Sequence, residues 1–240
     1  MEDIGKTSVN KGINTKSVKA GGSSANSVSK KKYKKRTSKK KRLRKLPFIL
    51  LLVFVFFIYG IFSMNNKISK DIAEKERLSK QEFISKIEKK AEEEYIKNGI
   101  LPSITISQAI LESNWGKSRL ALEGNNLFGI KADESWHGER INFKTKENYK
   151  DYIKADFRKY SSWDKSISDY ANFLRNNGRY KKNGLFDSKD YIKQAQSLED
   201  AGYATTKNEK GEKIYADKLI GVIKKYNLRK YDIEAINRAN

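Results

Sequence analysis

The sequence predicts a mainly α-helical (α+β) domain with one small β-hairpin lobe, preceded by a disordered basic tail and one transmembrane helix. Three observations support this prediction. Residues 1–45 are basic and nearly free of large apolar side chains, and residues 46–64 are apolar and uncharged. The rest of the chain carries apolar side chains mostly at helical spacing, with one stretch that partly alternates. About 150 residues after the apolar segment can bury a core of their own.

The basic tail covers residues 1–45. It holds 16 Lys and Arg residues against 2 acidic ones, so +14 of the total net charge of +22 lies here. Such a segment cannot bury enough apolar surface to offset the entropy lost on ordering, and we expect it to be disordered. A basic run can mark a nucleic-acid site, but beside an apolar span it is a topology signal that also attracts anionic lipid. We therefore expect no nucleic-acid partner.

The apolar segment, residues 46–64, predicts a single membrane crossing. As a helix, residues 46–62 would rise about 25 Å, at the short end of a bilayer span. The basic residues before the segment predict a cytoplasmic N-terminus and an extracytoplasmic domain that faces the cell wall. A cleaved signal peptide is the alternative, but the apolar run exceeds the usual length of roughly 7–15 residues and no small-residue cleavage site follows. We expect an uncleaved anchor in the cell membrane.

Residue usage excludes several kinds of site. The chain has no cysteine, which rules out disulfides, a thiol nucleophile and Cys-based metal sites. His137 is the only histidine, so a multi-His metal site is impossible and a Ser/His/Asp triad would have to use it without a G-x-S-x-G elbow. We expect no metal and no cofactor.

The domain is expected to cover residues 79–230, after a polar stalk at residues 65–78 and before a C-terminal tail at residues 231–240. Ser79-Lys80-Gln81-Glu82 resembles a capping box that would open a helix ending near Gly99. After the turn at Leu101-Pro102-Ser103 a second helix is predicted. On it Thr105, Gln108 and Glu112 share one face.

The later elements follow from the same patterns. Residues 124–131 and 136–138 are turn-like, and the partly alternating residues 140–155 predict a hairpin. Helical spacing returns from Ser162, at residues 191–198 and at residues 215–226.

Glu112 is the candidate general acid. It stands at the end of a predicted helix, with Gln108 one turn earlier, Trp115 able to desolvate its carboxyl, and a break at Gly116 that would open a cleft. Desolvation raises the pKa of a carboxyl, as a general acid near neutral pH requires. Cleavage of a glycosidic bond usually needs a second carboxylate, and the residues alone leave four candidates open. These are Asp133, Glu134, Glu139 and Glu147.

Aromatic residues are frequent in the same region. Trp136, beside His137 and Gly138, is the best candidate for an exposed platform that stacks on a sugar.

Several segments together resemble glycoside hydrolase family 73, the endo-β-N-acetylglucosaminidases that include peptidoglycan-cleaving autolysins. The resemblance spans roughly residues 79–229. Its segments are Ser107–Ser118 (SQAILESNWGKS), Gly124–Ala132 (GNNLFGIKA), Ala155–Ser162 (ADFRKYSS), Ala201–Thr205 (AGYAT) and Tyr215–Leu219 (YADKL). Two departures are the residues after Glu147 and the inserted residues 206–213, which predict a longer loop near Tyr203.

The resemblance implies a lysozyme-like domain that cleaves the β-1,4 bond between N-acetylglucosamine and N-acetylmuramic acid. It implies that Glu112 is the acid, that Glu147 in Thr145-Lys146-Glu147 is the second carboxylate, and that Tyr203 contacts substrate or water. The side chains expected to bind the peptidoglycan glycan strand are Gln108, Trp115, Asn126, Phe128, Trp136 and Tyr160.

Two rival functions stay open from the sequence. A lytic transglycosylase would use Glu112 alone, and a non-catalytic wall-binding scaffold would keep the fold without turnover. In the hydrolase, Glu147 would activate water unless the acetamido group of the substrate assists. Protein partners are not predicted.

Overall fold

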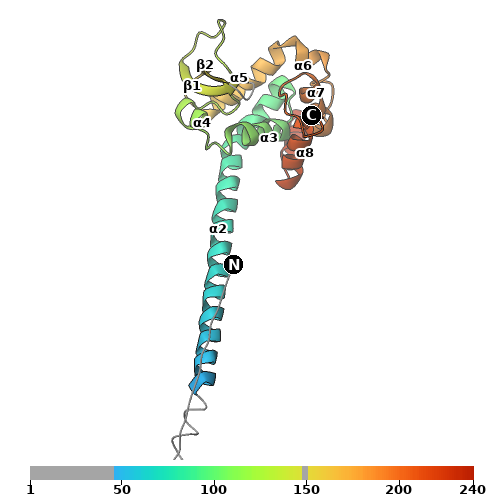
Figure 1. The fold of residues 1–240 in the computed structure, drawn as a ribbon. Coiled ribbons are helices and arrows are strands. Elements are labelled where there is room, and N and C mark those ends of the chain that lie inside the picture. The colour runs from blue at the N-terminus through green and yellow to red at the C-terminus, as the bar shows by residue number, and fades with distance from the viewer. Residues whose placement is uncertain (1–45, 148–150) are drawn as a thin grey trace, which may run out of the picture. The chain divides into compact units, whose positions relative to one another are not determined.

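A computed structural model describes residues 46–147 and 151–240, without the side chains of residues 144–147 and 151–153. The predictions for the tail at 1–45 and for residues 148–150 lie outside the described residues. The chain divides into two compact units, Met1–Ile61 and Phe62–Asn240. The second unit holds the folded domain (Figure 1).

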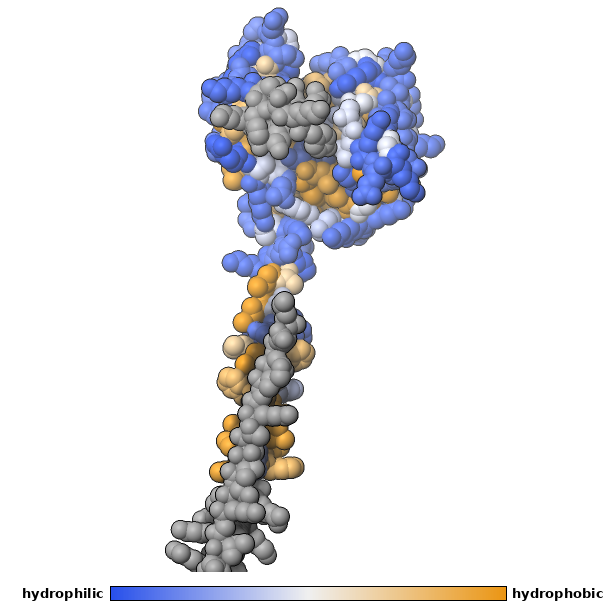
Figure 2. Space-filling model, viewed as in Figure 1, coloured by the Kyte–Doolittle hydropathy of each residue, from blue (hydrophilic) through white to orange (hydrophobic). Residues whose placement is uncertain are grey.

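Helix α2 (Leu46–Asn98) is continuous, so the predicted helix start at Ser79 is wrong. Residues 65–82 contain no Gly or Pro, and pairs such as Lys80 with Glu76 at 2.6 Å support the helix through this stretch. The helix ends before Gly99, whose φ of 77° suits glycine, as the sequence predicts. Within the described residues, α2 alone is long and apolar enough to cross a membrane, and its apolar surface is visible in Figure 2.

The domain is mainly helical with one two-stranded sheet, as predicted. Its further elements are α3 (Pro102–Ser113), α4 (Arg119–Gly124), β1 (Arg140–Glu147), β2 (Asp151–Arg158), α5 (Trp163–Asn176), α6 (Gly178–Lys182), α7 (Tyr191–Asp200), α8 (Tyr215–Lys225) and α9 (Arg229–Ala239). Strands β1 and β2 pair antiparallel, from Arg140 opposite Arg158 to Glu147 opposite Asp151. The hairpin prediction is therefore confirmed, with a second strand that ends at Arg158.

Helix α3 lies at the centre of the domain and packs against α7, α8 and α9 (Figure 1). Ten of its twelve residues are buried, including the apolar Ile104, Ile106 and Ala109. A helix buried this fully cannot leave its N-terminal N–H groups to water, and its own N-cap, Leu101, has no side-chain acceptor.

Two distant side chains satisfy the start of α3. Asp232 Oδ1 accepts a hydrogen bond from the backbone N–H of Ser103 at 2.8 Å, and Gln194 Oε1 accepts one from Leu101 at 2.9 Å. Asp232 belongs to α9, where Ala235 is also buried. The packed domain thus extends past residue 230, where the sequence placed its end, because the last helix supplies the cap of the first core helix.

Asp232 should make stability depend on pH. Burial raises the pKa of Asp232 to about 6, so the folded state binds more protons than the unfolded chain between about pH 4 and 6 and loses stability as the pH rises through this window. Asp232→Asn keeps an acceptor without a charge, so wild type should lose about 2–3 kcal/mol relative to this variant from pH 4 to 7. Urea unfolding of the full-length protein in mild detergent, followed by tryptophan fluorescence, measures the difference.

Asp232→Ala is the matched control, because it leaves the N–H of Ser103 without an acceptor. It should lower the free energy of unfolding by about 1–2 kcal/mol at pH 5. Stability curves of wild type and Asp232→Asn that stay parallel over this pH range would contradict the assignment.

Candidate active site

Glu112 lies in the last turn of α3, directly before a sharp reversal of the chain. Asn114, Trp115 and Gly116 have φ values of 50°, 62° and 71°, so three successive residues adopt the left-handed conformation that ends the helix. At Gly116 a Cβ atom would lie 2.7 Å from the Trp163 ring, so only glycine fits. The predicted break is confirmed, and Glu112 is exposed just before it, together with Leu111, on a helix whose other ten residues are buried.

The carboxyl of Glu112 is held by a buried tyrosine. The hydroxyl of Tyr215, the first residue of α8, donates to Glu112 Oε1 at 2.9 Å. The same hydroxyl accepts a hydrogen bond from Gln108 Nε2 at 2.9 Å. Gln108 Oε1 in turn accepts one from the hydroxyl of Tyr170 on α5. Glu112 thus ends a series of hydrogen bonds that runs into the core.

Electrostatics at this position favour a protonated acid. Burial by surrounding side chains raises the pKa of Glu112, while the hydrogen bond from Tyr215 and the charge of Lys218 act in the opposite direction. Burial and the nearby Glu112 raise the pKa of Tyr215, so this phenol stays a neutral donor. Solvent still reaches Glu112, so a substrate can approach it. This is the environment that a general acid requires.

Two tyrosines, of which the sequence singled out only one, meet beside Glu112. Tyr203, predicted as a substrate contact, is half-buried and stacks on Tyr215 with ring centroids 5.6 Å apart. Sequence reasoning did not identify Tyr215 as a site residue, although it opens the YADKL segment. Its helical spacing indicates only a core residue, and 103 residues separate it from Glu112.

Glu199 positions Tyr215. Helix α8 begins without a capping side chain at Ile214. The buried carboxylate of Glu199, on α7, instead accepts a hydrogen bond from the backbone N–H of Ala216 at 3.0 Å. This bond holds the first turn of α8, and therefore the Tyr215 ring, against α3.

Four residues predicted to bind substrate are buried and used within the protein. They are Gln108, Asn126, Phe128 and Tyr160. Asn126 donates to the carbonyls of Ile130 and Arg158 at 3.0 and 2.8 Å, which joins its loop to the end of β2. Phe128 stacks on Tyr170 at 3.9 Å. Because they are buried, these side chains have no surface that a substrate could contact. In this structure they pack beneath the site and hold its elements together.

Trp136 lies at the base of the hairpin and is half-buried. The guanidinium of Arg158 lies 4.7 Å from its ring centroid, and the Tyr160 ring meets it edge-on at 5.7 Å. Tyr160 donates to Asp169 Oδ2 at 2.7 Å, and Arg158 pairs with the same carboxylate at 2.9 Å. This cluster ties the hairpin to α5 and covers part of the indole that was predicted as a platform.

The structure places Trp115 in an aromatic cluster with α2 and the end of α8. Its ring meets Tyr226 at 4.7 Å and Phe83 at 6.0 Å, both edge-on. The sequence expected this indole to enclose the Glu112 carboxyl, but the ring that hydrogen-bonds there is Tyr215. The left-handed turn after α3 directs the chain at Trp115 toward α2.

The candidates for a second carboxylate differ in their surroundings. Glu147 is the last residue of β1, opposite Asp151, and its side chain is outside the described part. Glu139 pairs with Lys159 at 2.7 Å, which lowers its pKa. The hydrogen bond from Ser135 lowers the pKa of Asp133. Two of the rivals of Glu147 are therefore already occupied by partners.

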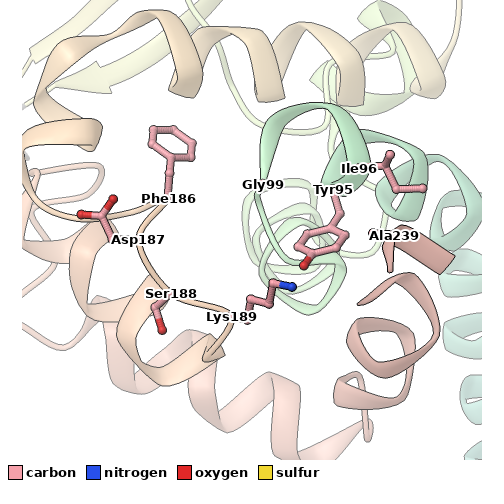
Figure 3. Close-up of a pocket in the computed structure, with 8 residues that line it drawn as sticks. All are labelled: Tyr95, Ile96, Gly99, Phe186, Asp187, Ser188, Lys189 and Ala239. Carbon is pink, nitrogen blue, oxygen red and sulfur yellow. The ribbon is translucent and has the colours of Figure 1, made fainter. Parts of the chain in front are cut away.

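One cavity of the described structure lies apart from Glu112. A cavity of about 300 Å³ lies between the end of α2, residues 186–189 and Ala239, as Figure 3 shows. Its lining includes Tyr95, Lys189 and one carboxylate, Asp187, and none of the residues around Glu112. Among the described residues, no three His, Asp or Glu side chains converge where they could hold a metal ion.

Residues 88–228 match the glucosaminidase family, described as mannosyl-glycoprotein endo-beta-N-acetylglucosaminidase. The chain belongs to the glucosaminidase family of glycoside hydrolases. The matched region contains both Glu112 and Tyr215. The chain is 38% identical over 205 residues to the exo-glucosaminidase LytG of Bacillus subtilis, an alignment that covers 79% of this chain and 69% of LytG. It is 36% identical to the peptidoglycan hydrolase FlgJ of Vibrio cholerae over 60% of this chain and 43% of FlgJ.

Solved structures of glucosaminidases resemble the domain. The catalytic domain of the Listeria monocytogenes autolysin Auto matches with a TM-score of 0.55 and 36% identity, over 64% of this chain and 87% of that one. The glycoside hydrolase domain of Salmonella typhimurium FlgJ matches with a TM-score of 0.52 and 29% identity, over 67% and 96%. The chain is a lysozyme-like, cell-wall-acting peptidoglycan hydrolase of this family, which confirms the predicted enzyme class.

Removal of the Glu199 carboxylate should disturb Tyr215 without removing it. Glu199→Ala deletes the acceptor for the N–H of Ala216, and we expect turnover to fall about tenfold, with about 1 kcal/mol lost in stability. Glu199→Gln keeps a carbonyl acceptor and should restore most of the turnover. Steady-state digestion of purified peptidoglycan measures both, with exposed Asp200→Ala as the control. Equal loss in the Ala and Gln variants would contradict a capping role.

Proposed function

We propose that this glucosaminidase is an endo-acting enzyme, anchored in the membrane, that cleaves the β-1,4 bond between N-acetylglucosamine and N-acetylmuramic acid with Glu112 as general acid. One observation carries the proposal. Within the region that matches the family, Glu112 is an exposed carboxyl at the end of a buried helix, and the buried phenol of Tyr215 holds one of its oxygens.

The reaction begins with a proton on Glu112. Burial raises the pKa of Glu112, which favours a protonated carboxyl, and cleavage requires that proton on the glycosidic oxygen as the bond breaks. Tyr215 then stabilises the carboxylate that remains, because its hydroxyl donates to Oε1. The phenol favours the charged form that exists after proton transfer, which supports an acid that must release its proton.

The second group comes from the hairpin in this proposal. Glu147, at the end of β1, would activate water on the opposite face of the sugar, unless the acetamido group of the substrate supplies the nucleophile. Support for Glu147 over Glu139 is that Lys159 already neutralises Glu139. Tyr203 would contact the acetamido group or the water, since it is half-buried and stacks on Tyr215.

The anchor is the N-terminal part of α2. Its side chains between residues 46 and 62 are exposed and apolar, for example Phe56 at 73% exposure, and no charge interrupts them. A surface of this kind is stable in lipid and costly in water. The 16 basic residues before it favour a cytoplasmic N-terminus, which places the catalytic domain on the side of the wall.

Three Glu→Gln variants of the full-length protein test the mechanism. Glu112→Gln should lower the turnover of purified peptidoglycan about 10³-fold, and Glu147→Gln about 10²-fold, because an acid and a base typically contribute this much. Glu139→Gln, the matched control in the same hairpin, should stay at the wild-type level. Mass spectrometry of the early products should show oligomeric fragments with new reducing N-acetylglucosamine ends.

Other products identify the alternatives. Reducing muramic ends would assign the protein to the other glycosidic bond, and anhydromuramic ends with an active Glu147→Gln variant would indicate a lytic transglycosylase. Release of single sugars from chain ends would point to exo cleavage, the activity in the name of the LytG relative. Intact turnover by Glu112→Gln would refute the proposed acid.

Topology can be tested cleanly because the chain has no cysteine. We expect a single cysteine at Asn65→Cys to react with a membrane-impermeant maleimide in intact cells, and one at Ser8→Cys to react only after permeabilisation. Both variants should remain in the membrane fraction after an alkaline carbonate wash. A mature protein that lacks residue 8 would instead demonstrate cleavage of a signal peptide.

A further inference from the structure

The hydrogen-bond series behind Glu112 consists of Tyr170, Gln108 and Tyr215. Tyr170 and Gln108 have no exposed surface, and Tyr215 has 3%. None of the three side chains is therefore open to a glycan strand, yet together they connect the catalytic carboxyl to the core. Their effect on the reaction must pass through Glu112.

Each donor in this series points toward Glu112: Tyr170 donates to Gln108, Gln108 to Tyr215, and Tyr215 to Glu112. The Gln108 amide nitrogen can only donate, so the single hydrogen of the Tyr215 hydroxyl is free for Glu112 Oε1. The amide keeps this orientation because its own oxygen accepts from Tyr170, which is itself wedged against Phe128. A hydrogen on Glu112 Oε1 that points at Tyr215 would clash with the hydrogen of the Tyr215 hydroxyl. The proton of the neutral acid therefore belongs on Oε2.

We infer that Tyr170 is a positioning residue for Glu112: through Gln108 and Tyr215 it makes Oε1 an obligatory acceptor and assigns the transferable proton to Oε2. The inference rests on the proposed role of Glu112 as general acid. It adds Tyr170, a residue on α5 that the substrate cannot contact. This residue would determine which oxygen of the Glu112 carboxyl carries the proton that is transferred to the scissile bond.

Loss of the Tyr170 hydroxyl has a defined consequence. Gln108 Oε1 would become a buried acceptor without a donor, which is costly. The amide can recover a partner by turning over, so that its oxygen accepts from Tyr215. The hydrogen of Tyr215 then leaves Glu112 and the carboxylate loses its stabilising donor. The acid would hold its proton to higher pH, and its proton could occupy either oxygen.

The other groups that act on Glu112 are unchanged by this substitution. Lys218 approaches it from α8, and Tyr203 from the segment after α7. Lys218 favours the carboxylate in wild type and variant alike. A change in the ionisation of Glu112 after Tyr170→Phe would therefore report on the hydrogen-bond series.

The experiment is the pH dependence of kcat/KM for the full-length protein in mild detergent, with solubilised peptidoglycan strands as the probe. A general acid is active below its pKa, so its ionisation appears as the alkaline limb of the profile. Tyr170→Phe should move this limb upward by about one pH unit, since a hydrogen bond to a charged group is worth roughly that much. At pH values below the limb, kcat should fall several-fold because the proton is shared between the two oxygens.

The double variant tests whether Tyr170 acts through Tyr215. Tyr215→Phe alone should shift the limb upward, and Tyr170→Phe added to it should produce no further shift. Additive shifts would show a separate effect and overturn the inference. Tyr180→Phe is the matched control, because Tyr180 is equally buried and its hydroxyl bonds to Arg179, outside the series. The limb should not move in that variant.

A second readout separates this inference from the proposed function. Infrared difference spectra of each protein against its Glu112→Gln counterpart follow ionisation of the carboxyl without turnover. A shifted titration of Glu112 in Tyr170→Phe supports the hydrogen-bond series, whatever the activity of Glu112→Gln. An active Glu112→Gln variant would refute only the role of Glu112 as general acid. An unshifted titration, with Glu112→Gln inactive, would overturn the inference and leave the proposed function intact.

Discussion

Complete burial of α3 is the constraint on which the rest of the domain depends. A helix with ten of twelve residues buried has little access to water, so its free N-terminal N–H groups need acceptors within the protein. Asp232 and Gln194 satisfy one end, and Tyr215 and Tyr170 satisfy Gln108 near the other. The packing of α5, α7, α8 and α9 follows from these requirements. Leu111 and Glu112, near the end of the helix, are its two exposed residues.

The same hydrogen bonds that solve the folding problem prepare the chemistry. Gln108 cannot be buried without partners, and the partner it finds, Tyr215, also holds Glu112. Glu199 joins this arrangement because α8 needs a cap and Tyr215 is its first residue. A surface glutamate has none of this support, and it would titrate well below the pH at which a general acid is useful. In this domain the position of the acid and the stability of the core therefore have the same origin.

Much of the architecture could be predicted from the sequence because it depends on local patterns. The spacing of apolar residues predicts α3, α5, α7 and α8, the partial alternation predicts the hairpin, and Trp115-Gly116 marks the end of the catalytic helix. Predictions from local sequence signals were wrong where residues farther along the chain determine the structure. The capping box at Ser79 lies inside α2, because nothing before it breaks the helix. Residues 231–239 look like a polar tail, but α9 buries Asp232 under α3.

By itself the sequence determined which residue types could perform the chemistry: one carboxyl at a helix end, no thiol, a single histidine and a long uncharged apolar segment. Only the tertiary structure decided how they are used. It turned Asn126, Phe128 and Tyr160 inward, placed Trp115 against α2, and brought Tyr215 to Glu112 across 103 residues. The physical reason is that helix periodicity records which face is buried and not which distant side chain meets it. Those partners are decided by tertiary packing, in which most buried polar groups find a hydrogen-bond partner.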